Sequence, residues 1–142
     1  MSGVRYFDDV EVGDELPPLH VTLTSAQVRA YAETANMPGG RFFSDEDARA
    51  EGLPGQIVPG NMSMALFSRL LTGWSEPGRL QRLNATFRGL VRPNVALTFH
   101  AVIIEKHSSD HGNFVECDLV LETADGERLV TGTATLQLPS RS

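Results

Sequence analysis

The sequence of 142 residues is poor in cysteine and has no long apolar run. Because its one cysteine, Cys117, cannot form an internal disulfide, nothing in the chain requires an oxidising compartment. The opening segment MSGVRYFDDVEVGDE lacks the apolar stretch of a signal peptide, and no run approaches the roughly 18 apolar residues of a membrane span. We therefore expect a cytoplasmic protein that is not inserted in a membrane.

Positive charge is also scarce, since 12 lysines and arginines face 18 acidic residues and the net charge is −6. This balance argues against nucleic acid or an anionic membrane surface as the main partner. Four arginines nevertheless cluster in the sequence, and a patch of this kind suits a phosphate on a carrier: Arg79, Arg82, Arg88 and Arg92. With 41% hydrophobic residues the chain can bury a core, and its length predicts one domain over residues 1–142.

The first half of the chain has helical periodicity. Apolar residues from Val28 to Ala35 recur at helical spacing behind Thr24 or Ser25, either of which can cap a helix. The segment SDEDARAEG predicts a short helix that begins after Ser44. After Pro59, the segment NMSMALFSRLLTGW is apolar nearly all round, which predicts a long helix in the middle of the fold.

The second half changes to the composition of strands. Four segments rich in Val, Leu, Thr and Phe are separated by turn residues, namely 82–93, 95–110, 113–126 and 127–139. Asp125-Gly126 is the signature of a two-residue hairpin. A short strand, helices and then about four antiparallel strands predict an α+β fold with helices on one face of the sheet.

Several segments carry a resemblance to a known family. FDDVEVGDELPP, VPGNMSMALFSRLL, VRPNVALTFHAVIIEKH and LVTGTATLQLP are similar to the MaoC-like (R)-specific enoyl-CoA hydratases and hydroxyacyl dehydratases. The resemblance implies a hot-dog fold, in which an antiparallel sheet wraps around a long central helix. It also implies an acyl thioester of CoA or a carrier protein as the ligand, and no cofactor.

Active members of this family carry a D-x-N-P-x-H loop whose Asp and His exchange protons with the acyl chain. The family spacing back from Gly60 places the Asp position at Met37 and the His position at Phe42. Neither side chain moves a proton, and general acid–base catalysis contributes roughly 10²–10⁴-fold per group. The resemblance therefore implies very low hydratase activity, unless Asn36, Arg41 or Asp45 replaces the lost groups.

Other parts of the family site are retained. Gly60 matches the glycine whose backbone N–H polarises the thioester carbonyl, and a helix N-terminus offers such donors whatever its side chains. Ser68 matches a family serine that faces the catalytic loop, and Pro59 stands where the family has histidine. We thus expect a substrate-binding site that comprises Met37, Phe42, Pro59, Gly60, Asn61 and Ser68.

Most of these candidate site residues also have a plainer structural interpretation. Asn36 suits a helix C-cap and Asn61 a loop, Arg41 suits an exposed loop or a clamp on a carboxylate or phosphate, and Asp45 suits the first turn of a helix. Ser68 can bond its own i−4 carbonyl, and Met37 and Phe42 can fill core.

The histidines predict no metal site. His107 and His111 have H-x₃-H spacing, but no cysteine or carboxylate-rich ligand set accompanies them. His100, in the middle of a strand, suits the core or a polar position in a channel.

Two functions remain open at this stage. The chain is either a MaoC-like hydratase or dehydratase that acts on or binds an apolar acyl thioester, or a non-catalytic subunit that shapes the acyl channel of a heterodimer. The second alternative rests on RFFSDEDARAEG, which resembles the loop of such subunits. A hot-dog domain adapted to another small-molecule reaction is a further alternative. In each case we expect a dimer, formed with a second copy or with a sister hot-dog chain.

Overall fold

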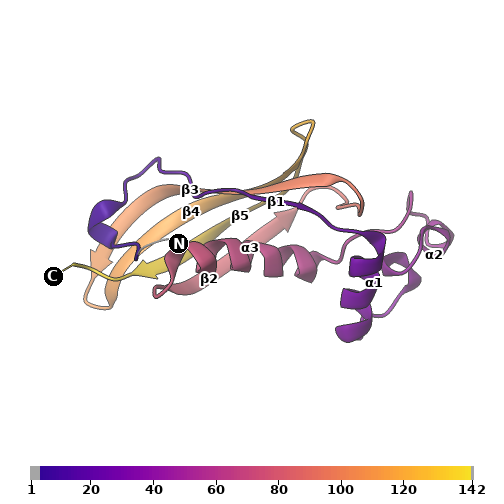
Figure 1. Cartoon of the computed structure of the whole chain (residues 1–142), viewed down its shortest axis with the longest axis horizontal. Helices are drawn as coiled ribbons and strands as arrows, with labels where there is room; N and C mark the ends of the chain where they lie inside the picture. The colour runs from indigo at the N-terminus through magenta and orange to yellow at the C-terminus, as the bar shows by residue number, and fades with distance from the viewer. Residues whose placement is uncertain (1–3, 142) are drawn as a thin grey trace.

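The computed structural model describes residues 4–141, and shows a curved sheet wrapped around one long helix (Figure 1). The helices are α1 (Ser25–Thr34), α2 (Asp45–Ala50) and α3 (Gly60–Ser75), with two 3₁₀ turns, η1 (Phe7–Asp9) and η2 (Gly40–Phe42). The strands are β1 (Leu19–Thr22), β2 (Arg79–Phe87), β3 (Ala96–Ser109), β4 (Gly112–Thr123) and β5 (Arg128–Leu138). This order confirms the predicted α+β class. No helix of residues 4–141 is long and apolar enough to cross a membrane.

The five strands form one antiparallel sheet in the order β1-β3-β4-β5-β2. Alternate residues of β3 and β4 are buried on the face that covers the core, as the two-residue period of a strand requires. Cys117 belongs to this face, and burial raises the pKa of its thiol to about 12. The thiol therefore stays protonated and packs as a small apolar side chain.

Helix α3 packs against the concave face of the sheet with one stripe of residues. Phe67 and Leu71 are fully buried, and the Phe67 ring meets the Phe99 ring edge-on with centroids 4.9 Å apart. Ala65 and Arg69 lie on the opposite side of the helix and are exposed. The predicted central helix is therefore confirmed, and the sheet covers one side of it in this chain.

Two strand boundaries differ from the predicted ones. The strand expected at 82–93 is β2, which begins at Arg79 and ends at Phe87. Residues 88–95 form a loop instead, anchored where the Val58 amide donates to the Val91 carbonyl (2.8 Å). Pro93 in this loop lacks an N–H and cannot donate to a strand ladder, so a strand could not have paired through it.

The predicted hairpin between β4 and β5 is present, but its loop is longer than two residues. The Thr123 amide donates to the Glu127 carbonyl (3.0 Å), so three residues lie between these partners. Gly126 has a φ of 84°, the left-handed conformation that ends a three-residue hairpin loop. The Asp-Gly pair therefore predicted the turn correctly and its length incorrectly.

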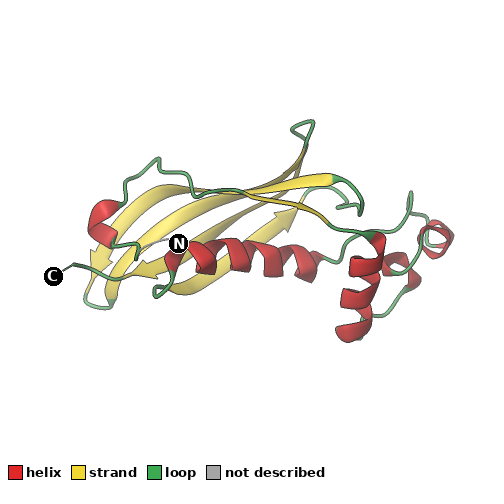
Figure 2. Cartoon of the chain, in the orientation of Figure 1, coloured by secondary structure: helices red, strands yellow, loops and turns green. Residues whose placement is uncertain are grey.

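The segments before α3 form a helical lobe (residues 25–58) that extends beyond the end of the sheet (Figure 2). Thr24 caps α1 in a capping box with Gln27, and Ser44 caps α2, as predicted. Because the lobe leads directly into Gly60, it lies beside the N-terminal end of α3.

Candidate functional site

The N-terminal turn of α3 is the centre of the candidate site. Its N-cap is Pro59, which makes no side-chain cap to the helix. Within residues 4–141 the backbone amides of Gly60 and Asn61 have no acceptor, and are left as donors at the positive end of a sixteen-residue helix. Such an end can bind a carbonyl oxygen or an anion.

An aromatic ring lies against this turn. A Cβ built on Gly60 would lie 3.0 Å from Cζ and 3.3 Å from Cε2 of Phe87, so the absent side chain permits the close approach of the ring. Phe87 is 47% exposed, and its ring gives the open end of α3 an apolar wall.

The helical lobe is fixed at this end by a buried glutamine. The side-chain amide of Gln56, which is 2% exposed, donates to the carbonyls of Phe42 (2.9 Å) and Ser25 (3.3 Å). Its side-chain oxygen accepts from the Ser25 hydroxyl. One side chain therefore joins the start of α1 to the η2 turn, over sequence distances of 31 and 14 residues.

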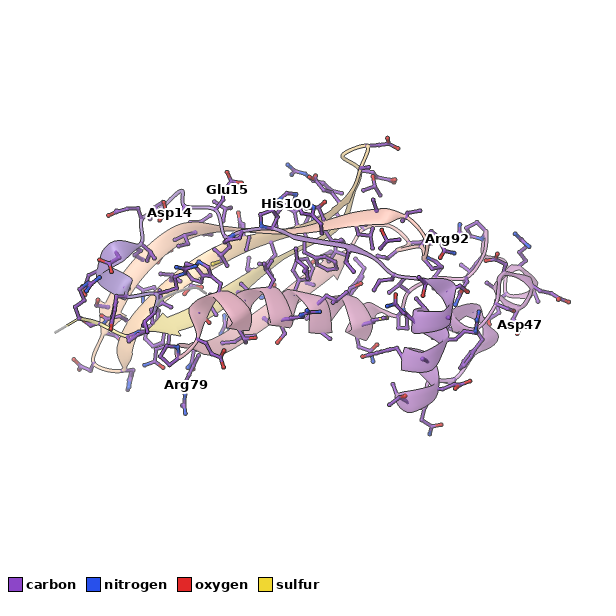
Figure 3. All side chains as sticks on the ribbon, viewed as in Figure 1. Asp14, Glu15, Asp47, Arg79, Arg92 and His100 are labelled. Carbon is purple, nitrogen blue, oxygen red and sulfur yellow. The ribbon has the colours of Figure 1, made fainter. Side chains whose placement is uncertain are left out.

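The Gln56 backbone extends the same network. Its amide donates to Asp45 Oδ1 (2.8 Å), and its carbonyl accepts from Arg92 Nε (2.9 Å). Arg92 Nη2 lies 4.0 Å from Asp45 Oδ1, and a Cβ on Gly55 would collide with both side chains. Figure 3 shows Arg92 between the sheet and the helical lobe. Asp45 thus holds the backbone of the lobe, in addition to its place in the first turn of α2.

Asn36 ends α1 in a left-handed conformation, with a φ of 54°. Its amide donates to Glu33 and that of Met37 donates to Ala32, which is the Schellman pattern of helix termination. The plainer interpretation of Asn36 as a cap is therefore the one that the backbone shows. A catalytic role for its exposed amide stays a prediction.

Arg41 clamps a carboxylate of its own chain. Its Nη1 and its backbone amide both donate to the Glu51 carboxylate at 3.0 Å, and its guanidinium lies over the Phe42 ring at 4.5 Å. These contacts tie η2 to the end of α2. An incoming phosphate or carboxylate would compete with Glu51 for the guanidinium.

The two residues at the predicted acid and base positions differ in burial. Phe42 is buried in the helical lobe (5% exposed), whereas Met37 is half-buried. The assignment of these positions to the family pair stays a prediction. Cavities of about 220 to 410 Å³ open on the described part of the chain, and neither Met37 nor Phe42 lines them.

The remaining predicted contacts lie along α3. Asn61 is exposed in the first turn, not in a loop. Ser68 is half-buried two turns further on, where its carbonyl accepts from the Thr72 hydroxyl (2.9 Å). The structure thus gathers Pro59, Gly60 and Asn61 at one end of α3, and Ser68 lies about 12 Å along the axis from Gly60, at 1.5 Å per residue.

Sequence reasoning missed Gln56 and Ser63. Ser63, 1% exposed, is one of the buried side chains whose hydroxyl has no hydrogen-bond partner within residues 4–141. No local pattern marks Ser63, because its importance comes from burial. For Gln56 the one signal was a glutamine placed between Gly55 and the apolar pair Ile57-Val58.

His100 and His107 bond carboxylates of β4, and the four arginines form no single patch. His100 bonds Glu122 (2.8 Å) on the face of the sheet away from α3 (Figure 3). His107 bonds Glu116 (2.9 Å) on β4. Over residues 4–141 no three His, Cys, Asp or Glu side chains are grouped so as to hold a metal. The prediction of a single arginine patch is wrong. Arg79 begins β2 and Arg88 follows its last residue, so the two lie about 30 Å apart at 3.3 Å per residue.

Solved structures share this architecture. A MaoC-like dehydratase from Rhodospirillum rubrum matches with a TM-score of 0.84 at 20% identity, over 97% of this chain and 99% of that one. The unliganded (R)-hydratase PhaJ1 of Pseudomonas aeruginosa matches with a TM-score of 0.84 at 16% identity, over 96% and 86%. A chain of the C-terminally truncated HadBC complex, a 3R-hydroxyacyl-ACP dehydratase of Mycobacterium tuberculosis, matches with a TM-score of 0.73 at 18% identity, over 88% and 95%.

The chain has the hot-dog fold of the MaoC-like dehydratases and (R)-hydratases. No family model matches the sequence, and comparison with curated proteins finds no match. Identities of 16 to 20% establish the fold and leave the activity to be argued from the site. In this hot-dog chain the helix is α3 and the sheet edge beside it is β2.

Proposed function

We propose that this chain is a MaoC-like protein that binds an acyl thioester, of CoA or of a carrier protein, at the N-terminal end of α3. The observation that carries the proposal is the uncapped first turn of α3, which offers the Gly60 and Asn61 amides beside the apolar Phe87 ring. A thioester needs both features, because its carbonyl oxygen accepts hydrogen bonds and its acyl chain is apolar.

We further propose that the chain does not supply the acid and base for hydration. The charged groups that could replace the family pair already have partners, since Arg41 bonds Glu51 and Asp45 accepts from the Gln56 amide. Met37 and Phe42, at the positions that the family spacing assigns, supply only apolar surface. The chain then acts as the substrate-holding member of a hydratase or dehydratase, in the cytoplasm.

A second hot-dog chain is the partner that this proposal requires. β2 pairs with β5 and with no other strand of residues 4–141, so one edge of a nine-residue strand is free to pair. Phe87 and Leu90 lie exposed at the end of this edge. A chain of the HadBC complex has this fold, which supports a sister hot-dog chain as the partner of β2. A second copy of this chain is the alternative partner.

The molar mass of the protein in solution distinguishes these alternatives. Light scattering on the purified chain separates a homodimer, at twice 15.5 kDa, from a monomer that awaits a sister subunit. A monomer that pairs with no other hot-dog chain would contradict the proposal of a partner.

Hydration of crotonyl-CoA, followed by loss of the enoyl absorbance, tests the proposed function. We expect the wild type to bind the thioester and to leave it unhydrated. The double variant Met37→Asp/Phe42→His restores both titratable groups and is expected to gain activity. Because Phe42 is buried, circular dichroism must first show that the double variant folds.

Each result has a separate meaning. Activity of the wild type alone would contradict the non-catalytic assignment, and Asn36, Arg41 and Asp45 would become the residues to mutate. Absence of both activity and thioester binding would overturn the acyl-thioester proposal itself.

A further inference from the structure

Ser63 is a buried polar residue that the proposed site does not yet explain. Its side chain is 1% exposed, and its hydroxyl has no hydrogen-bond partner within residues 4–141. An unsatisfied buried hydroxyl costs free energy, so its presence calls for an explanation at each position where it occurs.

The position of Ser63 connects it to the open end of α3. Ser63 follows Gly60 by three residues, and residues at this spacing are neighbours on one face of a helix. Helical side chains lean toward the N-terminus, so Ser63 leans back toward the turn that begins at Gly60, on the buried face of α3 that packs against the sheet.

The usual internal partner of such a hydroxyl is not used. Serine within a helix commonly donates to the carbonyl four residues earlier, which here belongs to Pro59. That carbonyl accepts from the backbone amides of Met62 (3.1 Å) and Ser63 (3.4 Å), and the Ser63 hydroxyl makes no bond to it. The hydroxyl is thus left as a donor on the same face as the first turn.

We propose that the Ser63 hydroxyl donates to the carbonyl oxygen of the bound acyl thioester, as a second donor beside the first-turn amides of α3. A carbonyl oxygen has two lone pairs, so one oxygen can accept from an amide and from the hydroxyl together. This inference rests on the proposed function, and makes Ser63 a substrate-binding residue that the resemblance did not assign.

The chain provides its own matched control. Ser75 lies on the same buried face of α3, is fully buried and also has an unpartnered hydroxyl within residues 4–141. It is twelve residues further along, about 18 Å away at 1.5 Å per residue, at the end of the helix that has no free amides. Ser63→Ala and Ser75→Ala therefore each remove a buried, unpartnered hydroxyl from the same face of α3, at opposite ends.

Titration calorimetry with two probes tests the proposal on the full chain. Butyryl-CoA carries the thioester carbonyl, and S-butyl-CoA is the thioether that lacks it. We expect Ser63→Ala to weaken butyryl-CoA by about three- to tenfold, the factor that a neutral hydrogen bond supplies, and to leave S-butyl-CoA unchanged. Ser75→Ala should change neither probe. Both variants should melt about 2–5 °C higher, because each removes an unsatisfied hydroxyl.

The outcomes separate the two proposals. If the wild type binds neither probe, the acyl-thioester function fails, and the role of Ser63 fails with it. If the wild type prefers butyryl-CoA but Ser63→Ala weakens both probes equally or neither, the function stands and the role of Ser63 is overturned. An equal loss of thioester preference in Ser75→Ala would also overturn it.

Discussion

The two ends of α3 are enclosed in different ways. At the C-terminal end the chain covers itself: the Arg5 guanidinium lies 5.8 Å from the Trp74 ring centroid, and Arg141 forms an ion pair with Asp9 (2.6 Å). At the N-terminal end the helical lobe lies beside the helix. The N-cap residue there, Pro59, provides no side-chain cap for the first turn, and Phe87 is half exposed. Figure 1 shows the described chain termini at the first end and the lobe at the second.

The two ends of α3 therefore differ in the groups that they leave for a ligand to bind. At the C-terminal end the Arg141–Asp9 pair and the Arg5–Trp74 contact are internal to the chain, and the cavity there, of about 340 Å³, is lined by side chains and by no first-turn amide of α3. The N-terminal end keeps amide donors unpaired beside apolar surface, while Gln56 holds the surrounding lobe in place. A rigid support around unpaired donors is the arrangement that binding a carbonyl oxygen requires.

The largest expected effect comes from removing the support of the N-terminal end. Gln56→Ala removes the donor to the buried Phe42 carbonyl and to the half-buried Ser25 carbonyl, and should lower the free energy of unfolding by about 2–4 kcal/mol. Urea denaturation measures the loss. Gln81→Ala, which removes an exposed glutamine contact on β2, is the control and should cost less than about 0.5 kcal/mol. Equal losses would show that Gln56 does not fix the lobe.

The two glycines of α3 sharpen the comparison at a smaller scale. Gly73 has no atom within 4 Å of a built Cβ, so Gly73→Ala should stabilise the helix by about 0.5–1 kcal/mol. Gly60→Ala brings its Cβ to 3.0 Å from the Phe87 ring, and should gain nothing or lose up to about 1 kcal/mol. Thermal unfolding of both variants checks the difference. A gain at Gly60 as large as that at Gly73 would mean that the ring does not press on this turn.

The smallest effect concerns the ion pair at the C-terminal end. A hydrogen bond from Arg141, helped by its charge, holds the pKa of Asp9 below its ordinary value of 3.8. A lowered carboxyl pKa adds stability that is present above the ordinary pKa and disappears as pH falls through the lower folded value. Arg141→Ala should therefore raise the Asp9 pKa toward 3.8, with little change in stability because the pair is exposed. An NMR titration of the Asp9 carboxyl that shows no rise would contradict this account.

Local signals carried most of the fold. The caps at Thr24 and Ser44, the end of α1 at Asn36 and the strands of the second half were all predictable, because propensity and periodicity act over a few residues. The end of β2 was less predictable, since the loop after it depends on a contact between Val58 and Val91.

Only the part of the candidate site that consists of backbone amides was predictable from the sequence. Gly60 could be placed by resemblance, and the structure puts it at an uncapped helix start. Gln56, Arg92 and Ser63 could not be found, because their roles come from partners far along the chain or from burial without a partner. The arginines that cluster in the sequence separate in space because β2 is extended, with Arg79 at its first residue and Arg88 after its last.

The most direct test is an NMR titration of the ¹⁵N-labelled chain with butyryl-CoA, using S-butyl-CoA as the reference. The account predicts that the amide resonances of Gly60 and Asn61 shift with the thioester and shift less with the thioether, while those around Ser75 stay in place. Equal shifts with both probes, or shifts confined to the C-terminal end of α3, would contradict the claim that the uncapped turn holds a thioester carbonyl.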